Sequence, residues 1–260
     1  MNELPLPGDF SGRVALVTGA ATGIGRATAL AFAQAGASVV VADIAQAAGL
    51  QTVEDIASAG GKARFLRVDV ADSTSVAEMV QQTVSWYGRL DVALNNAGTV
   101  IQEVSIAEME EEAWDRVLAV NLKGIFLCLK HEIRQMLAQG GGGAIVNTTS
   151  TTAFRTVLNS AAYSSSKAGI VALTRIAAAE NGGSGIRINA IAPAGIDTAM
   201  LAKGLGDNEA RKRDVAKTRV MRRLGAPEEA ASAVLWLCSN GASYITGHTL
   251  AVDGGVLASP

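Results

Sequence analysis

The sequence has very few of the residues that build disulfide frameworks or metal clusters. It contains two cysteines, Cys128 and Cys238, and two histidines, His131 and His248. These are too few for a disulfide scaffold, a thiolate cluster or a histidine-rich zinc site. We therefore expect no metal, and we expect His131 and both cysteines to serve packing.

Aromatic residues are also scarce, at 4% of the chain, although 49% of its 260 residues are hydrophobic. Small aliphatic side chains must therefore fill the core, and the chain is long enough for a sizeable one. Charge is nearly balanced, with 22 basic and 24 acidic residues, which argues against a dedicated nucleic-acid binder. There is no apolar run of the ~18 residues that a membrane helix needs, and residues 1–12 show no signal-peptide pattern. We expect a cytoplasmic protein that binds neither nucleic acid nor membrane.

Short β-branched runs alternate with longer helical stretches along the whole chain. The predicted strands cover 13–18, 38–43, 63–68, 90–95, 144–148, 186–191 and 249–252. The predicted helices cover 23–34, 45–59, 73–87, 161–180 and 227–238, with further helical material between 106 and 138. Apolar strands that are each followed by a helix are typical of a parallel sheet covered on both faces. The sequence therefore predicts an α/β fold, with a doubly wound parallel sheet of about seven strands in one domain spanning 1–260.

A glycine-rich loop follows the first predicted strand, in Thr18-Gly19-Ala20-Ala21-Thr22-Gly23-Ile24-Gly25. Doubly wound sheets bind ligands beyond the carboxyl ends of their strands. Glycines there let the backbone approach a pyrophosphate, which the positive end of the next helix attracts. Glycine spacing alone also fits a plain strand-to-helix turn, but the position of this loop favours dinucleotide binding.

The next strands end in residues that suit the rest of a dinucleotide. Asp43 ends the second strand, where a carboxylate accepts both ribose hydroxyls of an adenosine and repels a 2′-phosphate. It could instead cap the following helix. Asp69 and Val70 close the third strand and could face an adenine. The segment 95–98, Asn-Asn-Ala-Gly, ends the fourth strand, where small residues leave room for a flat cofactor.

A tyrosine and a lysine, Tyr163 and Lys167, stand four residues apart in the long predicted helix 161–180. This spacing places both on one helix face, so the ammonium can lie near the phenol. A free tyrosine has a pKa of about 10, and a neighbouring cation favours its phenolate. The pair predicts acid/base chemistry, although a purely structural pair has the same spacing.

Together these segments resemble the short-chain dehydrogenase/reductase family over nearly the whole chain. The Thr-Gly-x-x-x-Gly-x-Gly loop of the family matches 18–25, its Asn-Asn-Ala-Gly segment matches 95–98, and its Tyr-x-x-x-Lys motif matches Tyr163 and Lys167. The resemblance implies a Rossmann-type fold and the NAD-dependent interconversion of a secondary alcohol and a ketone by hydride transfer. It also implies a homotetramer.

The resemblance further implies roles for four residues. Tyr163 is the acid/base at the substrate oxygen, and Lys167 lowers its pKa and holds the nicotinamide ribose. Ser150 binds the substrate oxygen, although four neighbouring threonines leave the choice of hydroxyl open on chemistry alone. Asn121 holds a water that relays the proton, although on residues alone it could be a buried structural asparagine. The expected NAD contacts are Gly19, Thr22, Gly23, Ile24, Gly25, Asp43, Ile44, Asp69, Val70, Asn96, Ala97, Gly98, Tyr163, Lys167, Pro193, Ile196 and Thr198.

Residues 194–223 match the substrate lid of the family, with one departure. The family has Pro-Gly where this chain has Pro193-Ala194, and a Cβ disfavours positive φ, so we expect the loop to start with a different bend. Residues 203–223 include eight basic and three acidic residues, a net charge of +5. This stretch is either a solvated helix face or a reader of anionic substrates. The substrate pocket is expected to be largely apolar, near Val100, Thr152, Phe154, Val157 and Met200.

Two other functions stay open at this point. One is an NADP-dependent ketoreductase on the same fold, and the other is a non-catalytic protein that senses a dinucleotide. The complete set of tyrosine, lysine, serine and asparagine argues against the second, because a binding module needs no such set. The expected ligand is a small alcohol or ketone, which fold and motifs leave unspecified.

Overall fold

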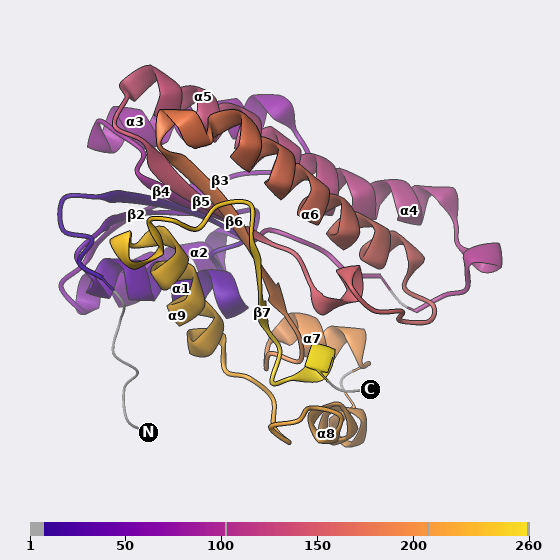
Figure 1. Ribbon diagram of the computed structural model, residues 1–260. Helices are drawn as coiled ribbons and strands as arrows, with labels where there is room; N and C mark the ends of the chain where they lie inside the picture. Colours follow the sequence, from indigo (N-terminus) through magenta and orange to yellow (C-terminus); the bar gives the residue numbers. More distant parts are fainter. Residues whose placement is uncertain (1–7, 102, 207, 259–260) are drawn as a thin grey trace.

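The computed structural model describes residues 8–101, 103–206 and 208–258. Within them, seven parallel strands form one sheet in the order β3-β2-β1-β4-β5-β6-β7 (Figure 1). The strands are β1 (Val14–Thr18), β2 (Ser38–Asp43), β3 (Lys62–Arg67), β4 (Val92–Asn95), β5 (Gly143–Thr148), β6 (Ile186–Pro193) and β7 (Thr249–Val252). The predicted fold class, a doubly wound Rossmann-type parallel sheet, is confirmed.

Helices cover both faces of this sheet (Figure 1). One face carries α1 (Gly23–Gln34), α2 (Gln46–Ser58) and α9 (Pro227–Cys238), and the other carries α3 (Ser73–Tyr87), α5 (Gly124–Gln139) and α6 (Ala161–Asn181). Successive strand residues alternate between the two cores: Ala15 and Val17 join the first, and Leu16 joins the second. Both faces are buried, which explains why the strands are apolar throughout.

Most elements lie where the sequence predicts them, and the differences fall around the site. Strand β6 runs two residues further than expected, to Pro193. The helical region between 106 and 138 contains α4 (Glu111–Leu118), a π-helical turn (Ala119–Lys123) and α5. Beyond β6, the lid contains two short helices, α7 (Ala199–Gly204) and α8 (Glu209–Lys217), which the sequence pattern did not resolve.

Two expectations concern residues that the structure does not describe. The absence of a signal-peptide pattern was read from residues 1–12, of which 1–7 lie outside the described residues, and position 207 of the lid does as well. Among the described helices, none is long and apolar enough to cross a bilayer.

The strand order places a crevice at one edge of the sheet. After β1 the chain builds outward through β2 and β3, and it then returns to place β4 on the other side of β1. The loops that follow β1 and β4 therefore diverge at their carboxyl ends and leave a space between them. This is the topological position at which the sequence predicts dinucleotide binding.

Candidate active site

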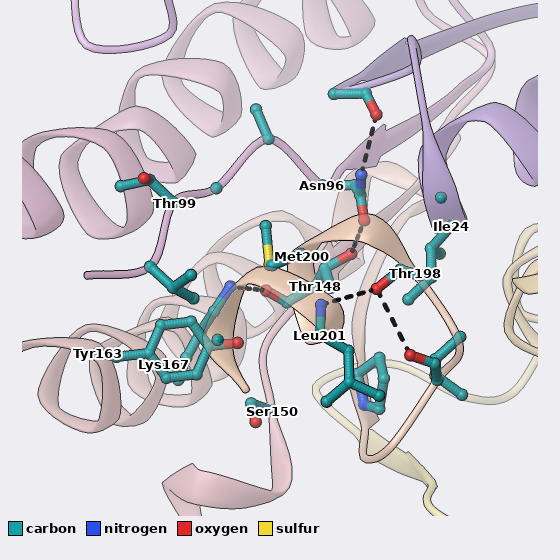
Figure 2. A pocket seen from close by; sticks show the side chains of 18 of the residues that line it. Ile24, Asn96, Thr99, Thr148, Ser150, Tyr163, Lys167, Thr198, Met200 and Leu201 are labelled. Carbon is teal, nitrogen blue, oxygen red and sulfur yellow. Dashed lines mark hydrogen bonds between the residues drawn. The ribbon is translucent and has the colours of Figure 1, made fainter. Parts of the chain in front are cut away.

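A cavity of about 630 Å³ opens at the carboxyl ends of the strands. It is lined by Ser150, Tyr163 and Lys167 from the β5 side, and by every expected cofactor contact except Gly25. Figure 2 shows Tyr163, Lys167 and Ser150 near one another, with Asn96, Ile24 and Thr198 on the side of the glycine-rich loop. The structure thus brings the predicted residues of six separate strand ends together in one space.

The glycine-rich loop fits a pyrophosphate because its backbone is unobstructed. Gly19 and Gly23 have φ angles of +65° and +55°, which side chains rarely adopt. A Cβ at Gly19 would lie 2.9 Å from the Cα of Ala97, and one at Gly25 would collide with the carbonyl oxygen of Gly19. Gly25 therefore packs beneath the loop rather than lining the cavity. Its role is to let α1 begin directly behind β1.

Thr18, the first residue of the loop motif, was given no role of its own by the sequence analysis, but its side chain joins β1 to β4. The hydroxyl of Thr18 accepts hydrogen bonds from the backbone N–H groups of Asn96 at 3.0 Å and Ala97 at 3.3 Å. The side-chain amide of Asn96 donates to the carbonyl of Gly19 at 3.3 Å. These bonds hold the two loops at a fixed separation. In the sequence, the sign of this role is a polar residue, Thr18, at the end of an otherwise apolar strand.

Asp43 lies at the opposite end of the cavity from Tyr163. Its two oxygens accept hydrogen bonds from the backbone N–H groups of Ala21 and Ala45, each at 2.9 Å. The capping alternative is wrong, because the N-cap of α2 is Ala45 and has no side-chain cap hydrogen bond; Asp43 instead accepts from the N–H of Ala45 in the turn before the helix. Each carboxylate oxygen has a second lone pair, so both can still accept hydrogen bonds from a ligand. The cations among the described lining residues are Arg155, Lys167 and Arg219, which belong to the β5 and β6 side.

Tyr163 and Lys167 meet as the helical spacing predicts. The Nζ of Lys167 lies 5.5 Å from the centre of the Tyr163 ring and donates a hydrogen bond to the carbonyl of Thr148 at 2.9 Å. Burial lowers the pKa of Lys167 to about 8. Burial also raises the pKa of Tyr163, an effect that the nearby Ser150 hydroxyl partly offsets. The pKa of Tyr163 is thus raised in this structure, and its lowering by Lys167 stays a prediction.

Asn121 lies in the π-helical turn, just behind the cavity. Its side-chain oxygen accepts from the backbone N–H of Thr99 at 2.7 Å, and its amide donates to the carbonyl of Thr99 at 2.9 Å and to Ser166 at 3.3 Å. Gly98 separates it from Lys167: a Cβ there would lie 3.3 Å from the Asn121 oxygen and 3.8 Å from Lys167 Nζ. The side chain therefore fixes the loop after β4, and the proposed water relay stays a prediction.

A buried polar network supports these strand ends from below. The amide of Asn95 donates to Glu132 at 2.9 Å and to Asn147 at 3.1 Å, and Asn147 donates to Thr174 at 3.0 Å. The network joins β4 and β5 to α5 and α6. Burial raises the pKa of Glu132 to about 7. In the sequence, the sign of this network is a charged residue, Glu132, on an otherwise apolar helix face.

The loop after β6 resolves the question raised by Ala194. The left-handed residue of this loop is Gly195, with a φ of +63°, one position after the alanine. The backbone N–H of Ala194 pairs with Val252 at 3.1 Å. The bend therefore falls on a glycine, and the Cβ of Ala194 is not strained.

Two of the five residues expected in the substrate pocket lie outside it. Val100, Thr152 and Met200 line the cavity, but Phe154 and Val157 do not. The 3₁₀ turn Thr151–Ala153 that follows Ser150 leaves Phe154 on the outside, where 46% of its surface is exposed. Two cations that the sequence reading did not assign to the pocket, Arg155 and Arg219, line it instead.

The cations of the lid fall into two groups. Four of them pair with carboxylates: Arg211 with Glu103 at 3.3 Å, Lys212 with Asp197 at 2.7 Å, Lys217 with Asp214 at 2.9 Å and Arg223 with Glu229 at 2.7 Å. These pairs lie at least partly in solvent and match a solvated helix face. Arg219 differs, because its side chain is buried.

Comparison with known proteins agrees with this geometry. A family model described as enoyl-(acyl carrier protein) reductase matches residues 19–257. A short chain dehydrogenase/reductase of Aspergillus oryzae is 44% identical over 251 residues, which are 95% of each chain. A cis-4-hydroxycyclohexanecarboxylate dehydrogenase of Sinomonas cyclohexanicum is 43% identical, over 96% of this chain and 98% of the relative. A cyclohexanol dehydrogenase of an Acinetobacter species is 40% identical, over 94% and 95%.

A solved structure shows the same fold. A crystal structure of a Beutenbergia cavernae protein with NADP bound at low occupancy superposes with a TM-score of 0.90 at 36% identity, covering 96% of this chain and 99% of that one. The chain belongs to the short-chain dehydrogenase/reductase family, as the motifs indicated. It is an oxidoreductase of that kind, and its cofactor is a nicotinamide dinucleotide.

Proposed function

We propose that this protein is an NAD-dependent dehydrogenase that interconverts a secondary alcohol and a ketone. The observation that carries the proposal is the layout of the cavity. Ser150, Tyr163 and Lys167 converge at one end, and Asp43 faces the same space at the other. The relatives named for cyclohexanol and for a hydroxycyclohexanecarboxylate support a small alcohol as the substrate class.

The residues present fit NAD along the length of the cavity. The Gly19 and Gly23 backbone would hold the pyrophosphate, because a side chain at Gly19 would fill the cradle against Ala97. Asp43 would accept the adenosine ribose hydroxyls. Bound NAD supplies the acceptor for a hydride from the alcohol carbon.

The side chains of this protein handle the proton. In alcohol oxidation, Ser150 orients the substrate oxygen and the Tyr163 phenolate accepts the hydroxyl proton as the carbonyl forms. Because burial raises the pKa of Tyr163, the phenolate needs a nearby positive charge. Lys167 supplies it from 5.5 Å and is itself held on the Thr148 carbonyl. In ketone reduction, the same phenol returns the proton.

Asp43 is the reason to propose NAD rather than NADP. The 2′-phosphate of NADP would place a second negative charge beside this carboxylate. Like charges in a partly buried site cost several kcal/mol. An offsetting cation is absent from the described lining around Asp43, where the neighbouring residues are Ala42 and Ile44.

The rest of the expected organisation completes the proposal. Residues 194–223 act as a lid of the single domain, because Met200 and Leu201 line the cavity and Thr198 contacts Gly23 of the phosphate loop. The homotetramer has support from an apolar groove along α5 and α6, beside which Phe126 and Ile176 are about half exposed. We place the protein in the cytoplasm.

A panel of secondary alcohols, assayed with NAD and with NADP by the absorbance of the reduced cofactor, tests the function. Cyclohexanol and cis-4-hydroxycyclohexanecarboxylate belong in this panel. We expect turnover of at least one alcohol, with NAD preferred. Turnover with NADP alone would favour the ketoreductase alternative. Cofactor binding without turnover of any alcohol or ketone would favour the non-catalytic one.

A further inference from the structure

Arg219 is a buried cation whose hydrogen-bonding capacity is largely unused. Only 7% of its surface is exposed. Its Nη1 donates to the hydroxyl of Thr218 at 2.7 Å, whereas its Nε is buried without a hydrogen-bond partner. Leaving a buried charged donor unpaired is costly, more so than for a neutral group. The side chain therefore has both the charge and the free N–H groups to bind an anion.

Arg219 lines the cavity beside the loop that follows β6. It packs on Gly195, in the loop after β6, where a Cβ would lie 2.8 Å from both its Nε and its Nη2. Arg219 lines the same cavity as Ser150 and Tyr163. Gly195 thus has a second function besides its positive φ, because any side chain there would push the guanidinium away.

A second cation, Arg155, lines the cavity from the loop that follows Ser150. Burial lowers the pKa of Arg219, and the positive charge of Arg155, which lines the same cavity, lowers it further. Two like charges that share one cavity repel each other, and an anion bound between them would offset both the repulsion and the burial.

The described acidic residues offset the charge of this pair only in part. Neither Arg155 nor Arg219 takes part in an ion pair among the described side chains. The charge of Asp253 offsets part of the charge of Arg219, but Asp253 forms no ion pair with it, and its two oxygens accept hydrogen bonds from the backbone N–H groups of Gly255 and Leu257, each at 2.8 Å. Glu103, which also lines the cavity, pairs with Arg211 at 3.3 Å. The wall of the cavity therefore carries positive charge that no described ion pair cancels.

We propose that Arg219, assisted by Arg155, binds a carboxylate of the substrate, so that the preferred substrate is a hydroxycarboxylate or its keto form. This inference rests on the proposed function and adds the substrate class. A guanidinium is a planar fork that binds a carboxylate with two parallel N–H···O bonds. The carboxylate lies at Arg219, and the hydroxyl that reacts lies at Ser150 and Tyr163.

A matched pair of substrates tests the proposal in the wild-type enzyme. The pair is cis-4-hydroxycyclohexanecarboxylate and its carboxamide, which has the same ring without the charge. We expect kcat/KM to be at least tenfold higher for the carboxylate, mainly through a lower KM; tenfold corresponds to ~1.4 kcal/mol. Equal values for the two compounds would overturn the proposal.

Substitutions test which arginine gives the preference for the carboxylate. Arg219→Met should lower kcat/KM for the carboxylate at least fivefold more than for the carboxamide, and Arg155→Met should do so to a smaller extent. Arg213→Met is the control, because Arg213 is an exposed cation of the same segment that does not line the cavity. If Arg219→Met instead raised the KM of NAD and affected both substrates equally, the arginine would serve the cofactor phosphates and the proposal would be wrong.

A binding measurement separates this inference from the proposed function. Cyclohexanecarboxylate has no hydroxyl to oxidise, so calorimetric titration into the NAD-bound protein reports the anion site alone. We expect it to bind at least tenfold more tightly than cyclohexanecarboxamide, with the difference lost in Arg219→Met. Should Arg219→Met fail to fold, two measurements still test the proposal: the comparison of the two ligands in the wild type, and the same comparison in Arg155→Met, where the exchanged residue is exposed. Binding without any turnover contradicts the proposed function only, whereas turnover of alcohols without this preference contradicts the carboxylate site only.

Discussion

The strand ends and the lid hold their charged groups in opposite ways. Lys167 of α6 is 4% exposed and is fixed by a hydrogen bond of 2.9 Å to the carbonyl of Thr148, at the end of β5. In the lid, Arg211 and Glu103 pair while each is about half exposed. Exposed pairs contribute only about 0–1 kcal/mol, whereas a buried hydrogen bond to a charged group contributes about 1.5–3 kcal/mol. The comparison indicates that the reaction depends on single residues at the strand ends and that the lid tolerates change outside its buried arginine.

The largest effect should come from Tyr163→Phe. This change removes the phenolic proton carrier, and general acid/base groups typically contribute ~10²–10⁴-fold in rate. We expect kcat to fall by at least that range while NAD still binds, as measured by steady-state kinetics and by fluorescence titration of the cofactor. Tyr244→Phe is the matched control, because Tyr244 is fully exposed and lies outside the cavity. Retention of more than about a tenth of the wild-type kcat would contradict the acid/base role.

The pH dependence should distinguish the two directions of the reaction. Oxidation needs the Tyr163 phenolate, and burial raises the pKa of this phenol, so the base form is scarce at low pH. We expect kcat/KM for the alcohol to rise with pH, by up to about tenfold per unit, and to level off as Lys167 loses its proton above its pKa of about 8. Ketone reduction uses the protonated phenol and should not rise with pH. Identical profiles in both directions would place the proton transfer on another group.

Asp43→Ala should have a smaller effect, confined to the choice of cofactor. We expect the wild type to prefer NAD by at least tenfold in kcat/KM, or ~1.4 kcal/mol, and the variant to lose most of that preference. Asp72→Ala is a matched control, because Asp72 accepts a similar backbone hydrogen bond, from Thr74 at 2.9 Å, but lies outside the cavity. A wild-type preference for NADP, or a variant that still selects NAD, would show that Asp43 does not discriminate.

The smallest effect should follow from changing Arg211, Lys212 and Arg213 together to glutamine. Two of these cations form ion pairs that are partly in solvent, and none lines the cavity. We expect KM and kcat to change less than about twofold, because exposed charges are screened over ~8–10 Å at physiological ionic strength. A rise in KM that disappears at high salt would instead show that this exposed surface attracts an anionic substrate.

The same contrast explains which parts of the site the sequence could predict. Tyr163 and Lys167 are neighbours through the helical repeat itself, and the loop of Gly19 and Gly23 follows directly from a strand-to-helix turn. Their spacing is local, so it is visible along the chain. The ends of the helices around the cavity were harder to predict from the sequence. The π-helical turn depends on hydrogen bonds between Asn121 and the backbone of Thr99, which lies in a different loop.

The substrate end depends on contacts between distant segments. Arg219 contacts Gly195, which lies 24 positions earlier in the sequence, and it lies near Arg155 of another loop. No repeat in the chain predicts either contact. In the sequence, Arg219 was one of eight basic residues in the lid. Only the fold separates it from the cations that pair at the surface. Phe154 was wrongly placed in the pocket for the same reason, since it lies one residue before Arg155 but outside the cavity.

The central claim is that a hydride passes from the alcohol carbon to the nicotinamide cofactor while Tyr163 takes the proton. The most direct measurement uses the best alcohol of the panel, deuterated at the carbinol carbon, with unlabelled NAD and wild-type protein. Mass spectrometry of the reduced cofactor should show one deuterium per molecule, with a slower rate than for the unlabelled alcohol if hydride transfer limits turnover. Reduced cofactor without deuterium, or deuterium released to water, would contradict the account.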